Sequence, residues 1–350
     1  MRCYCVIHHG QPLELVDKPV PTPQGTQVLV KVRAAGLCHT DLHLWEGHYD
    51  IGGGKKLTLA ERGIKPPLTL SHEIVGEVVA AGEQAGSVPL GKTMLVHPWI
   101  GCGECAACRR GEENICIKPQ VMGIMQPGGF AEYTVVPHPR YLVDIDGLDP
   151  AAATPLACAG LTTYSALRKF GARIHEGPVV IIGAGGLGLM AIEVLKALGG
   201  QGAIVVDIDP AKRAAALAAG ALQAIGAKAP DVVQQIQAAT GGGARAVLDL
   251  VGATATVGTA LACCARGGHV VVCGLMGGDL TLSLPVIPMR PLTLQGSYVG
   301  TLDELRELVA LAQRRTMKPI PVTRRPLAEA NEALMALHEG RIVGRTILVP

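Results

Sequence analysis

The sequence predicts a mixed α/β protein with a β-rich first domain followed by a doubly wound parallel sheet. Three observations support this fold class. The chain has 350 residues, which is more than a single hydrophobic core usually organises. Up to about residue 154, short β-branched runs are separated by Pro and Gly. From about residue 155, strand patterns alternate with helix patterns, which is typical of parallel sheets.

The first part contains four runs that we expect to form an antiparallel, partly barrel-like sheet. They are Gln27–Arg33, Glu73–Ala80, Thr93–His97 and Ala131–Val136. Segment 49–67 lies between the first two runs. It has three consecutive glycines from Gly52, and we expect a short helix over Leu57–Arg62 in it.

The second part alternates short apolar runs with helical patterns that stop at glycine, as a βαβ chain does. A final apolar run then reads as a last strand. The expected strands are Pro178–Ile182, Ala203–Val206, Ala246–Leu250, His269–Cys273 and Thr346–Val349, and the expected helices are Leu187–Leu198, Pro210–Ala219, Thr301–Arg314 and Leu327–Glu339.

The amino-acid composition of the chain excludes some classes of binding partner. Hydrophobic residues make up 49% and charged residues 17% of the chain, and the formal net charge is +2. No basic tract is interleaved with aromatics, so we expect no nucleic-acid partner. We also expect no signal peptide and no membrane span, because the apolar runs are short and broken by glycine. We therefore expect a cytoplasmic protein, in which clustered cysteines indicate metal binding or catalysis.

Four cysteines lie within one short stretch: Cys102, Cys105, Cys108 and Cys116. Thiolates two residues apart can converge on one cation, and four of them close a tetrahedral structural zinc site. The alternative is two disulfides, which the expected compartment disfavours. Five other cysteines read as small buried apolar residues: Cys3, Cys5, Cys263, Cys264 and Cys273.

A glycine pattern follows the strand expected at Pro178–Ile182. Gly183 permits a tight turn, Gly185 allows the backbone to approach a pyrophosphate, and Gly188 allows a helix to pack closely. Asp207 ends the next strand, where its carboxylate can bind an adenosine ribose and repel a 2′-phosphate. The pattern favours NAD over NADP. Asp207 could instead cap the helix that begins at Pro210, although Asp209 fits that role better.

A second metal site can be assembled from Cys38, His72 and Cys158. Two thiolates and one imidazole leave a fourth tetrahedral position open, as in a catalytic zinc site. Each residue alone has an ordinary alternative, since Cys158 could be a buried core thiol and His72 a hydrogen-bonded core histidine. The pair formed by His72 and Glu73 is no metalloprotease signature, because Gly76 occupies the position of the second histidine.

Taken together, these motifs resemble the zinc-containing alcohol dehydrogenases of the medium-chain dehydrogenase/reductase superfamily. The segment around Cys38, the pair His72–Glu73, the four-cysteine lobe, the segment around Cys158 and the glycine loop occur in family order, essentially from end to end. The length, Thr40 and Arg345 resemble the tetrameric microbial and archaeal branch. The resemblance implies a GroES-like catalytic domain over 1–154 with a structural zinc lobe at 97–118. It also implies a Rossmann-type NAD domain over 155–293 and a return to the catalytic domain over 294–350.

The resemblance also assigns roles around the zinc. It implies that Cys38, His72 and Cys158 bind the catalytic zinc, with Asp41 orienting the histidine. Glu73 is expected behind the metal. The remaining roles concern the substrate and its proton: Thr40 would bond the substrate oxygen, His43 would pass the proton to solvent, and Trp99 and Tyr298 would line the pocket.

For the cofactor, the resemblance implies contacts with every part of NAD. His39 and Arg345 would contact the pyrophosphate, Thr162 would border the nicotinamide, and Lys212 would assist Asp207 at the ribose. The loop itself comprises Gly183, Gly185, Gly186, Leu187 and Gly188.

The implied reaction is reversible hydride transfer between a primary or secondary alcohol and NAD through a zinc-bound alkoxide, in a homotetramer that holds two zinc ions per chain. Cys158 distinguishes the chain from polyol dehydrogenases, which usually have glutamate there, and Asp207 distinguishes it from NADP-dependent cinnamyl-alcohol types. Those substrate classes, and a catalytically silent zinc-stabilised NAD-binding protein, remain the alternatives.

The chain departs from the family pattern at two places. Ser71 replaces the glycine that is usual before the His-Glu pair. Segment 49–67 is longer than in the simplest members, and we expect it to shape the substrate cleft or an interface.

Overall fold

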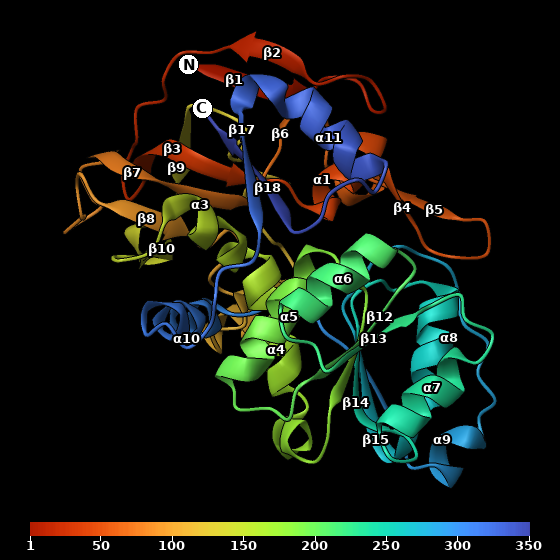
Figure 1. Ribbon diagram of the computed structural model, residues 1–350. Helices are drawn as coiled ribbons and strands as arrows, with labels where there is room; N and C mark the ends of the chain where they lie inside the picture. Colours follow the sequence, from red (N-terminus) through yellow and green to blue (C-terminus); the bar gives the residue numbers. More distant parts are fainter.

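The computed structural model describes residues 1–350 as two lobes, with the β-rich one uppermost in Figure 1. The β-rich lobe is built on a sheet of seven strands in the order β10-β8-β7-β3-β18-β17, with β9 paired to β3. These strands are β3 (Val28–Gly36), β7 (Glu73–Ala81), β8 (Thr93–Val96), β9 (Tyr133–Val136), β10 (Leu142–Asp144), β17 (Val322–Pro326) and β18 (Arg345–Val349).

The end of the chain returns to this first sheet. Strand β18 pairs antiparallel with β3 through Leu348 and Ala35, and parallel with β17. Helix α11 (Ala330–His338) lies beside it, against α1 (His39–Glu46). The register places the start of β18, at Arg345, next to the end of β3 and thus next to Cys38.

Two smaller sheets complete the β-rich lobe. One has the order β2-β1-β6 and contains β1 (Arg2–Val6), β2 (Glu14–Asp17) and β6 (Leu68–Thr69). The other is a hairpin of β4 (His48–Asp50) and β5 (Lys56–Thr58). The expected helix over Leu57–Arg62 is wrong, because β5 occupies its start and only a single 3-10 turn, Ala60–Arg62, follows. Thr58 explains the difference, since its backbone N–H and hydroxyl both bond Glu61 and close that turn.

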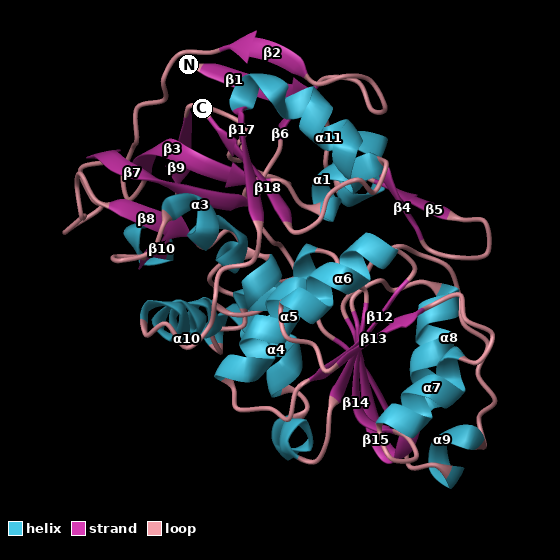
Figure 2. Cartoon of the chain, viewed as in Figure 1, coloured by secondary structure: helices cyan, strands magenta, loops and turns pink.

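The second lobe is a six-stranded parallel sheet in the order β13-β12-β11-β14-β15-β16. Helices cover both faces, as Figure 2 shows. The strands are β11 (Val179–Ile182), β12 (Ala203–Asp207), β13 (Gln223–Gly226), β14 (Ala244–Asp249), β15 (Cys264–Val272) and β16 (Thr293–Gly296). The helices are α4 (Ala159–Arg168), α5 (Gly186–Ala197), α6 (Pro210–Ala218), α7 (Val232–Ala239) and α8 (Thr254–Cys263). Helix α10 (Leu302–Gln313) lies away from this sheet, against α4 and β10.

Burial on both faces explains why β11 is a continuous apolar run. Val179 and Ile181 belong to the large core under α4 and α5, whereas Val180 and Ile182 belong to a second core under α7 and α8. A parallel strand covered on both sides needs apolar residues at every position. The predicted fold class, a β-rich domain plus a doubly wound sheet, is confirmed. Among the helices, none combines the length and apolar character needed to cross a bilayer.

Candidate active site and metal centres

The structure brings Cys38, His72 and Cys158 together from three separate elements. Cys38 precedes the first turn of α1, His72 precedes β7, and Cys158 precedes α4. All three side chains are buried, and their ligand atoms lie within 4.8 Å of one another. The two sulfurs are 3.8 Å apart and not bonded covalently.

This cluster fits a tetrahedral zinc ion. Zinc–sulfur bonds of about 2.3 Å at tetrahedral angles place two sulfurs roughly 3.8 Å apart, which matches the separation found here. Both ring nitrogens of His72 are buried and have no hydrogen-bond partner. A buried imidazole without any partner is unusual, and a metal ion would supply one. The Cys158 thiol and then the Arg345 charge hold the pKa of Cys38 well below its usual range, which favours the thiolate that binds metals.

Asp41 has different partners from those expected. Its Oδ2 accepts the backbone N–H of Cys38 at 2.8 Å, and its Oδ1 accepts the backbone N–H of Ser71 at 2.9 Å. The sequence interpretation had Asp41 bonded to the His72 ring, but that ring makes no hydrogen bond. Asp41 therefore fixes the backbone beside two of the clustered residues, and burial raises its own pKa to about 6.

Ser71 has a left-handed backbone, with a φ of +73°. This conformation favours glycine, which explains why glycine is the usual residue before the His-Glu pair. The Ser71 hydroxyl donates to the carbonyls of Gly36 at 2.9 Å and Glu73 at 3.2 Å. These bonds offset part of the conformational cost and tie the segment to the end of β3.

Glu73 forms a buried ion pair with Arg345. Arg345 Nη2 donates to Glu73 Oε1 at 2.7 Å and lies 3.7 Å from Cys38 Sγ. Burial raises the pKa of Glu73 to about 7, against the opposing charge of Arg345. The guanidinium thus contacts the metal cluster in addition to any role at a pyrophosphate. The proximity of β18 to β3 produces this pair, and no local sequence pattern indicates it.

The residues expected to carry the proton lie along α1. Thr40 Oγ1 is 3.9 Å from Cys38 Sγ. The His43 ring lies farther along the helix, 5.8 Å from the His39 ring and 3.6 Å from a Glu46 carboxylate oxygen. Burial lowers the pKa of His43, the His39 charge lowers it further, and Glu46 opposes both. His43 is therefore neutral, and able to accept a proton, at lower pH than a free histidine.

Aromatic rings line the approach to the cluster. The Trp99 ring is 5.2 Å from the His72 ring and 5.9 Å from the Tyr298 ring. The indole is 2% exposed and donates to the carbonyl of Ala157 at 3.0 Å, whereas Tyr298 is 43% exposed. Tyr49, which the sequence interpretation did not single out, packs against His43 with the ring centres 4.7 Å apart.

The glycine loop connects β11 to α5 and lies against the start of β18. Gly183 has a φ of +101°, and Gly188 lies so close to the Gly183 carbonyl that no Cβ fits. A Cβ on Gly186 would lie 2.9 Å from the Gly344 carbonyl and 3.3 Å from the Arg345 side chain, while one on Gly185 would face open space. The first helical turn of α5, at Gly186 and Leu187, leaves free N–H groups for an anion.

Asp207 lies at the end of β12 and contacts this loop. Its Oδ2 accepts the Ala184 N–H at 2.6 Å and its Oδ1 accepts the Asp209 N–H at 2.8 Å. Asp209 caps α6 by accepting the Ala211 N–H at 2.8 Å. Arg213, which was not predicted, donates to the Asp207 carbonyl at 3.0 Å.

Two further residues expected at the cofactor lie in helices of the second lobe. Lys212 lies in α6, and its charge adds to the lowering of the His39 pKa, for which burial is the main cause. Thr162 lies in the first turn of α4, where its N–H bonds the Cys158 carbonyl at 2.8 Å. Thr162 therefore lies one helical turn beyond the expected zinc ligand Cys158.

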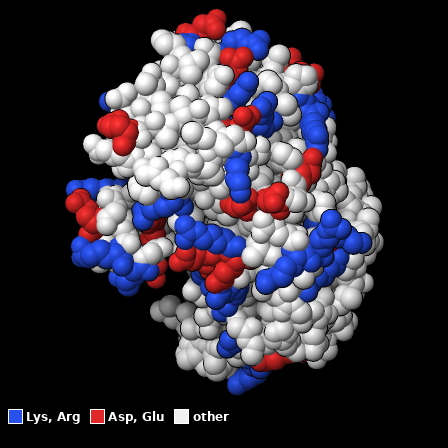
Figure 3. Space-filling model, turned by 90° about the vertical axis from the view of Figure 1, so that its left-hand side faces the viewer, with Lys and Arg blue, Asp and Glu red and all other residues white.

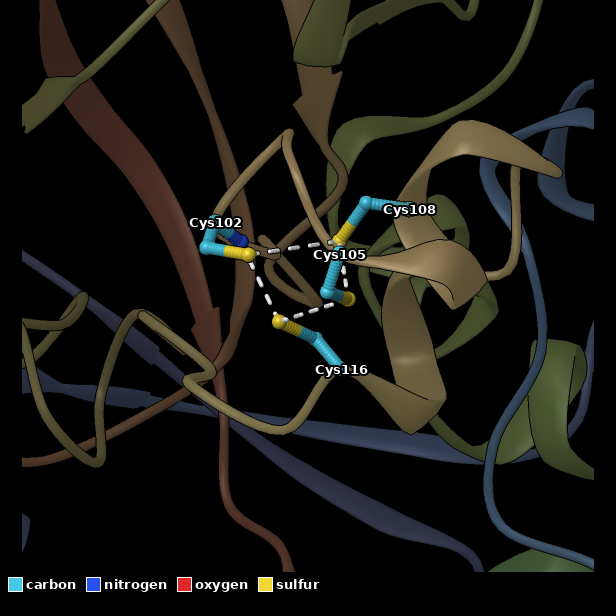
Figure 4. A group of neighbouring side chains, drawn as sticks. All are labelled: Cys102, Cys105, Cys108 and Cys116. Carbon is cyan, nitrogen blue, oxygen red and sulfur yellow. Dashed lines mark hydrogen bonds between the residues drawn. The ribbon is translucent and has the colours of Figure 1, made fainter.

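The four clustered cysteines converge in a separate lobe around α2 (Ala106–Arg109), shown in Figure 4. Neighbouring sulfurs are 3.5 Å apart for Cys105 and Cys108, 3.8 Å for Cys105 and Cys116, and 3.9 Å for Cys102 and Cys108. All four cysteines are free thiols, and these distances again match a tetrahedral thiolate shell. The donor set fits a structural zinc ion better than two disulfides.

Glu113 attaches this lobe to the β-rich domain. Its Oε2 accepts the Gly101 N–H at 2.8 Å and the Tyr141 hydroxyl at 2.7 Å, and its Oε1 accepts Arg140 Nη2 at 2.5 Å. The carboxylate is 7% exposed, so its three bonds satisfy a charge that burial would otherwise penalise.

Comparisons with known proteins agree with this architecture. Residues 24–147 match the family model of the alcohol dehydrogenase GroES-like domain, and residues 186–314 match that of the zinc-binding dehydrogenase. The chain is 39% identical to an NAD-dependent alcohol dehydrogenase of Sulfurisphaera tokodaii and 36% identical to one of Saccharolobus solfataricus, in both cases over all of both chains. It covers all of an alcohol dehydrogenase structure from Aeropyrum pernix with a TM-score of 0.90 and 31% identity.

Relatives with other substrates also match. The chain is 34% identical, over 97% of its length and 95% of the relative, to D-arabinose 1-dehydrogenase (NADP(+)) of Saccharolobus solfataricus. The full-length matches, the two family models and the fold nevertheless agree on one family. The chain belongs to the zinc-containing alcohol dehydrogenases of the medium-chain dehydrogenase/reductase superfamily, a family of oxidoreductase enzymes.

Proposed function

We propose that this protein is an alcohol dehydrogenase that interconverts primary or secondary alcohols with aldehydes or ketones, using NAD. The single observation that carries the proposal is the convergence of Cys38, His72 and Cys158 with two orphaned imidazole nitrogens, next to a hydroxyl and a second imidazole on α1. A purely structural metal site needs no such neighbours, whereas alcohol oxidation must remove a proton as well as a hydride.

The catalytic zinc would be held by Cys38, His72 and Cys158, and would supply Lewis-acid chemistry that lowers the pKa of an alcohol. The neighbouring side chains would perform the remaining steps. Thr40 would hold the substrate oxygen through a hydrogen bond and relay its proton by giving up its own hydroxyl proton, which His43 would accept through the cofactor ribose and pass towards solvent. Trp99 and Tyr298 exclude water around the carbon that loses the hydride.

The NAD site would run from the glycine loop to the end of β12. Free N–H groups at the start of α5 would face the pyrophosphate, Arg345 would add positive charge, and the neutral His39 ring would add a contact. The Asp207 carboxylate would receive the ribose hydroxyls, with Lys212 assisting it, and Thr162 would border the nicotinamide. NAD is favoured over NADP because a carboxylate at this point repels a 2′-phosphate.

Each chain would bind two zinc ions, one at the active site and one held by Cys102, Cys105, Cys108 and Cys116. The abundance of free thiols supports a reducing, cytoplasmic location. Figure 3 shows positive and negative side chains interspersed on one face, which supports small molecules rather than nucleic acid as substrates.

A homotetramer would cover the free edge of the parallel sheet. Strand β16 has no partner on its outer side, and all four of its residues are exposed. Large apolar side chains are exposed around it: Leu284 at 75%, Met289 at 66% and Leu294 at 46%. An unpaired edge beside exposed apolar groups supports an interface with another copy. Sedimentation analysis tests the assembly size.

The function is tested by following NADH absorbance with purified protein and a panel of primary, secondary and polyhydric alcohols. Turnover with simple alcohols and NAD is the expected result. Turnover confined to polyols or to cinnamyl-type alcohols would show that the proposed substrate class, simple alcohols, is wrong. No turnover with any alcohol, despite bound zinc and NAD, would identify a catalytically silent NAD-binding protein.

A further inference from the structure

Segment 49–67 lies beside the expected proton relay, because its first residue, Tyr49, packs against His43. Figure 1 shows the hairpin β4–β5 projecting from the β-rich lobe over the nucleotide lobe. The N–H of Gly53 at its tip donates to Asp279 Oδ2 at 2.9 Å, and Gly52, with a φ of +81°, packs against the backbone of Gly278. These contacts join the two lobes and fix the position of the 3-10 turn that follows.

Arg62 ends that turn and faces the aromatic lining of the cleft. Its guanidinium carbon lies 5.4 Å from the centre of the Tyr49 ring, and this ring lies 4.7 Å from His43. Burial raises the pKa of Tyr49 to about 12, and the charge of Arg62 opposes this rise. The same cation opposes the burial-driven rise in the pKa of Tyr298, so it acts on both tyrosines.

Arg62 has no acidic partner. It forms none of the protein's ion pairs, although Glu61 is its neighbour in sequence. The Glu61 carboxylate is engaged by the N–H of Thr58 at 2.7 Å and its hydroxyl at 2.6 Å. The other acid of the segment, Asp50, accepts the Gly52 N–H at 2.8 Å. Three further cations of the segment are also unpaired: Lys55, Lys56 and Lys65.

Arg62 is exposed, as an ordinary solvated surface arginine is. Arg62 differs because it lies over the Tyr49 ring, which itself packs against the expected proton relay His43, and because both nearby carboxylates are already occupied. A guanidinium held in this way is preorganised for a second, anionic contact, which it can make in bidentate form with a carboxylate.

We propose that Arg62 is a specificity residue that selects alcohols bearing a carboxylate at the end of the molecule remote from the carbinol, that is, ω-hydroxy acids and the corresponding aldehyde acids. This inference rests on the proposed function and deepens it. Lys55, Lys56 and Lys65, in the same segment as Arg62, add a positive field that attracts the same substrates.

The test compares alcohols of equal chain length that differ only at the far end: ω-hydroxyhexanoate, hexanol and ω-aminohexanol. In the wild-type enzyme we expect kcat/KM to be about tenfold higher for the carboxylate than for hexanol, since a hydrogen bond between charged groups favours the acid and the exposure of Arg62 limits the gain. The ammonium compound should be the poorest substrate. Added salt should reduce the preference.

Two variants and one control isolate the residue. In Arg62→Gln, KM for ω-hydroxyhexanoate should rise until kcat/KM is nearly equal for the acid and for hexanol. Turnover of hexanol and KM for NAD should stay unchanged. Arg62→Lys should keep part of the preference. The matched control Lys65→Gln removes an unpaired cation from the same segment and should keep most of it.

The outcomes separate this inference from the function beneath it. If neutral alcohols are oxidised and the wild-type enzyme shows no carboxylate preference, the role of Arg62 is overturned and the proposed function stands. An equal loss of preference in Lys65→Gln would show a diffuse field rather than an Arg62 contact, which also overturns it. If no alcohol is oxidised at all, the proposed function fails and this inference fails with it.

Discussion

Arg345 Nη2 donates a hydrogen bond to Glu73 Oε1 across 2.7 Å, in an ion pair whose side chains are 6% and 0% exposed. The pair joins the start of β18, at the end of the chain, to the start of β7 in the first domain. Removing one member of a buried pair leaves the other charge without compensation, which costs far more than the pair itself contributes.

The variant Arg345→Met should therefore lower the free energy of unfolding by about 3–5 kcal/mol. Urea denaturation of the zinc-loaded protein measures this loss. Adding Glu73→Gln in the same chain should restore a large part of it, because no buried charge is then unpaired. If the double variant is as unstable as the sum of the two single variants, the ion pair is not the origin of the effect.

The two cysteine clusters should respond differently to substitution. Cys105→Ser should impair folding and lower the thermal midpoint, because binding of structural zinc is coupled to folding. Cys158→Ser should spare the fold and abolish activity. Metal analysis should give two zinc ions in the wild type, and Cys263→Ser, a buried cysteine outside both clusters, should keep both. One zinc ion in a fully active chain would contradict the assignment.

Asp207→Gly should raise KM for NAD and relieve the exclusion of NADP. The loss should reach about a hundredfold in kcat/KM for NAD, because charged hydrogen bonds contribute roughly 1.5–3 kcal/mol each. The bond from Ala184 to Asp207 adds to the loss, since it also holds the glycine loop. Arg213 stays beside the vacated position and can favour a 2′-phosphate. Steady-state kinetics with both cofactors measures this, and a wild-type preference for NADP would refute it.

His43→Gln should lower alcohol oxidation roughly tenfold near neutral pH, at or below the usual range for general acid–base groups, because water partly replaces the imidazole. Since burial depresses the pKa of His43, the wild-type base is neutral at neutral pH and is lost only as pH falls through that depressed pKa. The pH–rate profile of the variant should lack this step. Its activity should recover at higher pH or with small added bases, while zinc content stays constant. An unchanged profile would assign the proton to another route.

The depressed pKa also has a consequence for stability. The unfolded chain binds a proton at His43 at a higher pH than the native protein does. The contribution of this residue to stability is therefore full above the unfolded pKa and is lost as pH falls from that value to the native one.

Much of the nucleotide domain could be predicted from sequence because strands covered on both faces must be apolar throughout, as β11 and β12 are. Helix α8 was missed because its threonines and glycine have low helix propensity, and tertiary packing of Ala260 and Leu261 overrides it. Strand β16 was missed because all its residues are exposed, so it has no apolar alternation.

The residues of the candidate site also fall into two groups, those that the sequence indicates and those whose roles depend on the tertiary fold. Metal-ligand chemistry and glycine spacing indicate the clustered cysteines, His72 and the loop, because those roles depend on residue type. The partners of Asp41 and Arg345 could not be predicted, because they depend on which strands become neighbours. Arg62 and Tyr49 escaped notice for the same reason, since nothing local places an arginine over a ring thirteen positions earlier.

The bond between Gly53 and Asp279 is one of the contacts that tie the β4–β5 hairpin of the first lobe to the second lobe. If the two lobes move apart at this hairpin, that hydrogen bond breaks and Gly52 leaves the Gly278 backbone. Since the same short hairpin precedes the turn that holds Arg62, a change of sequence at its glycines would alter turnover frequency and substrate choice together.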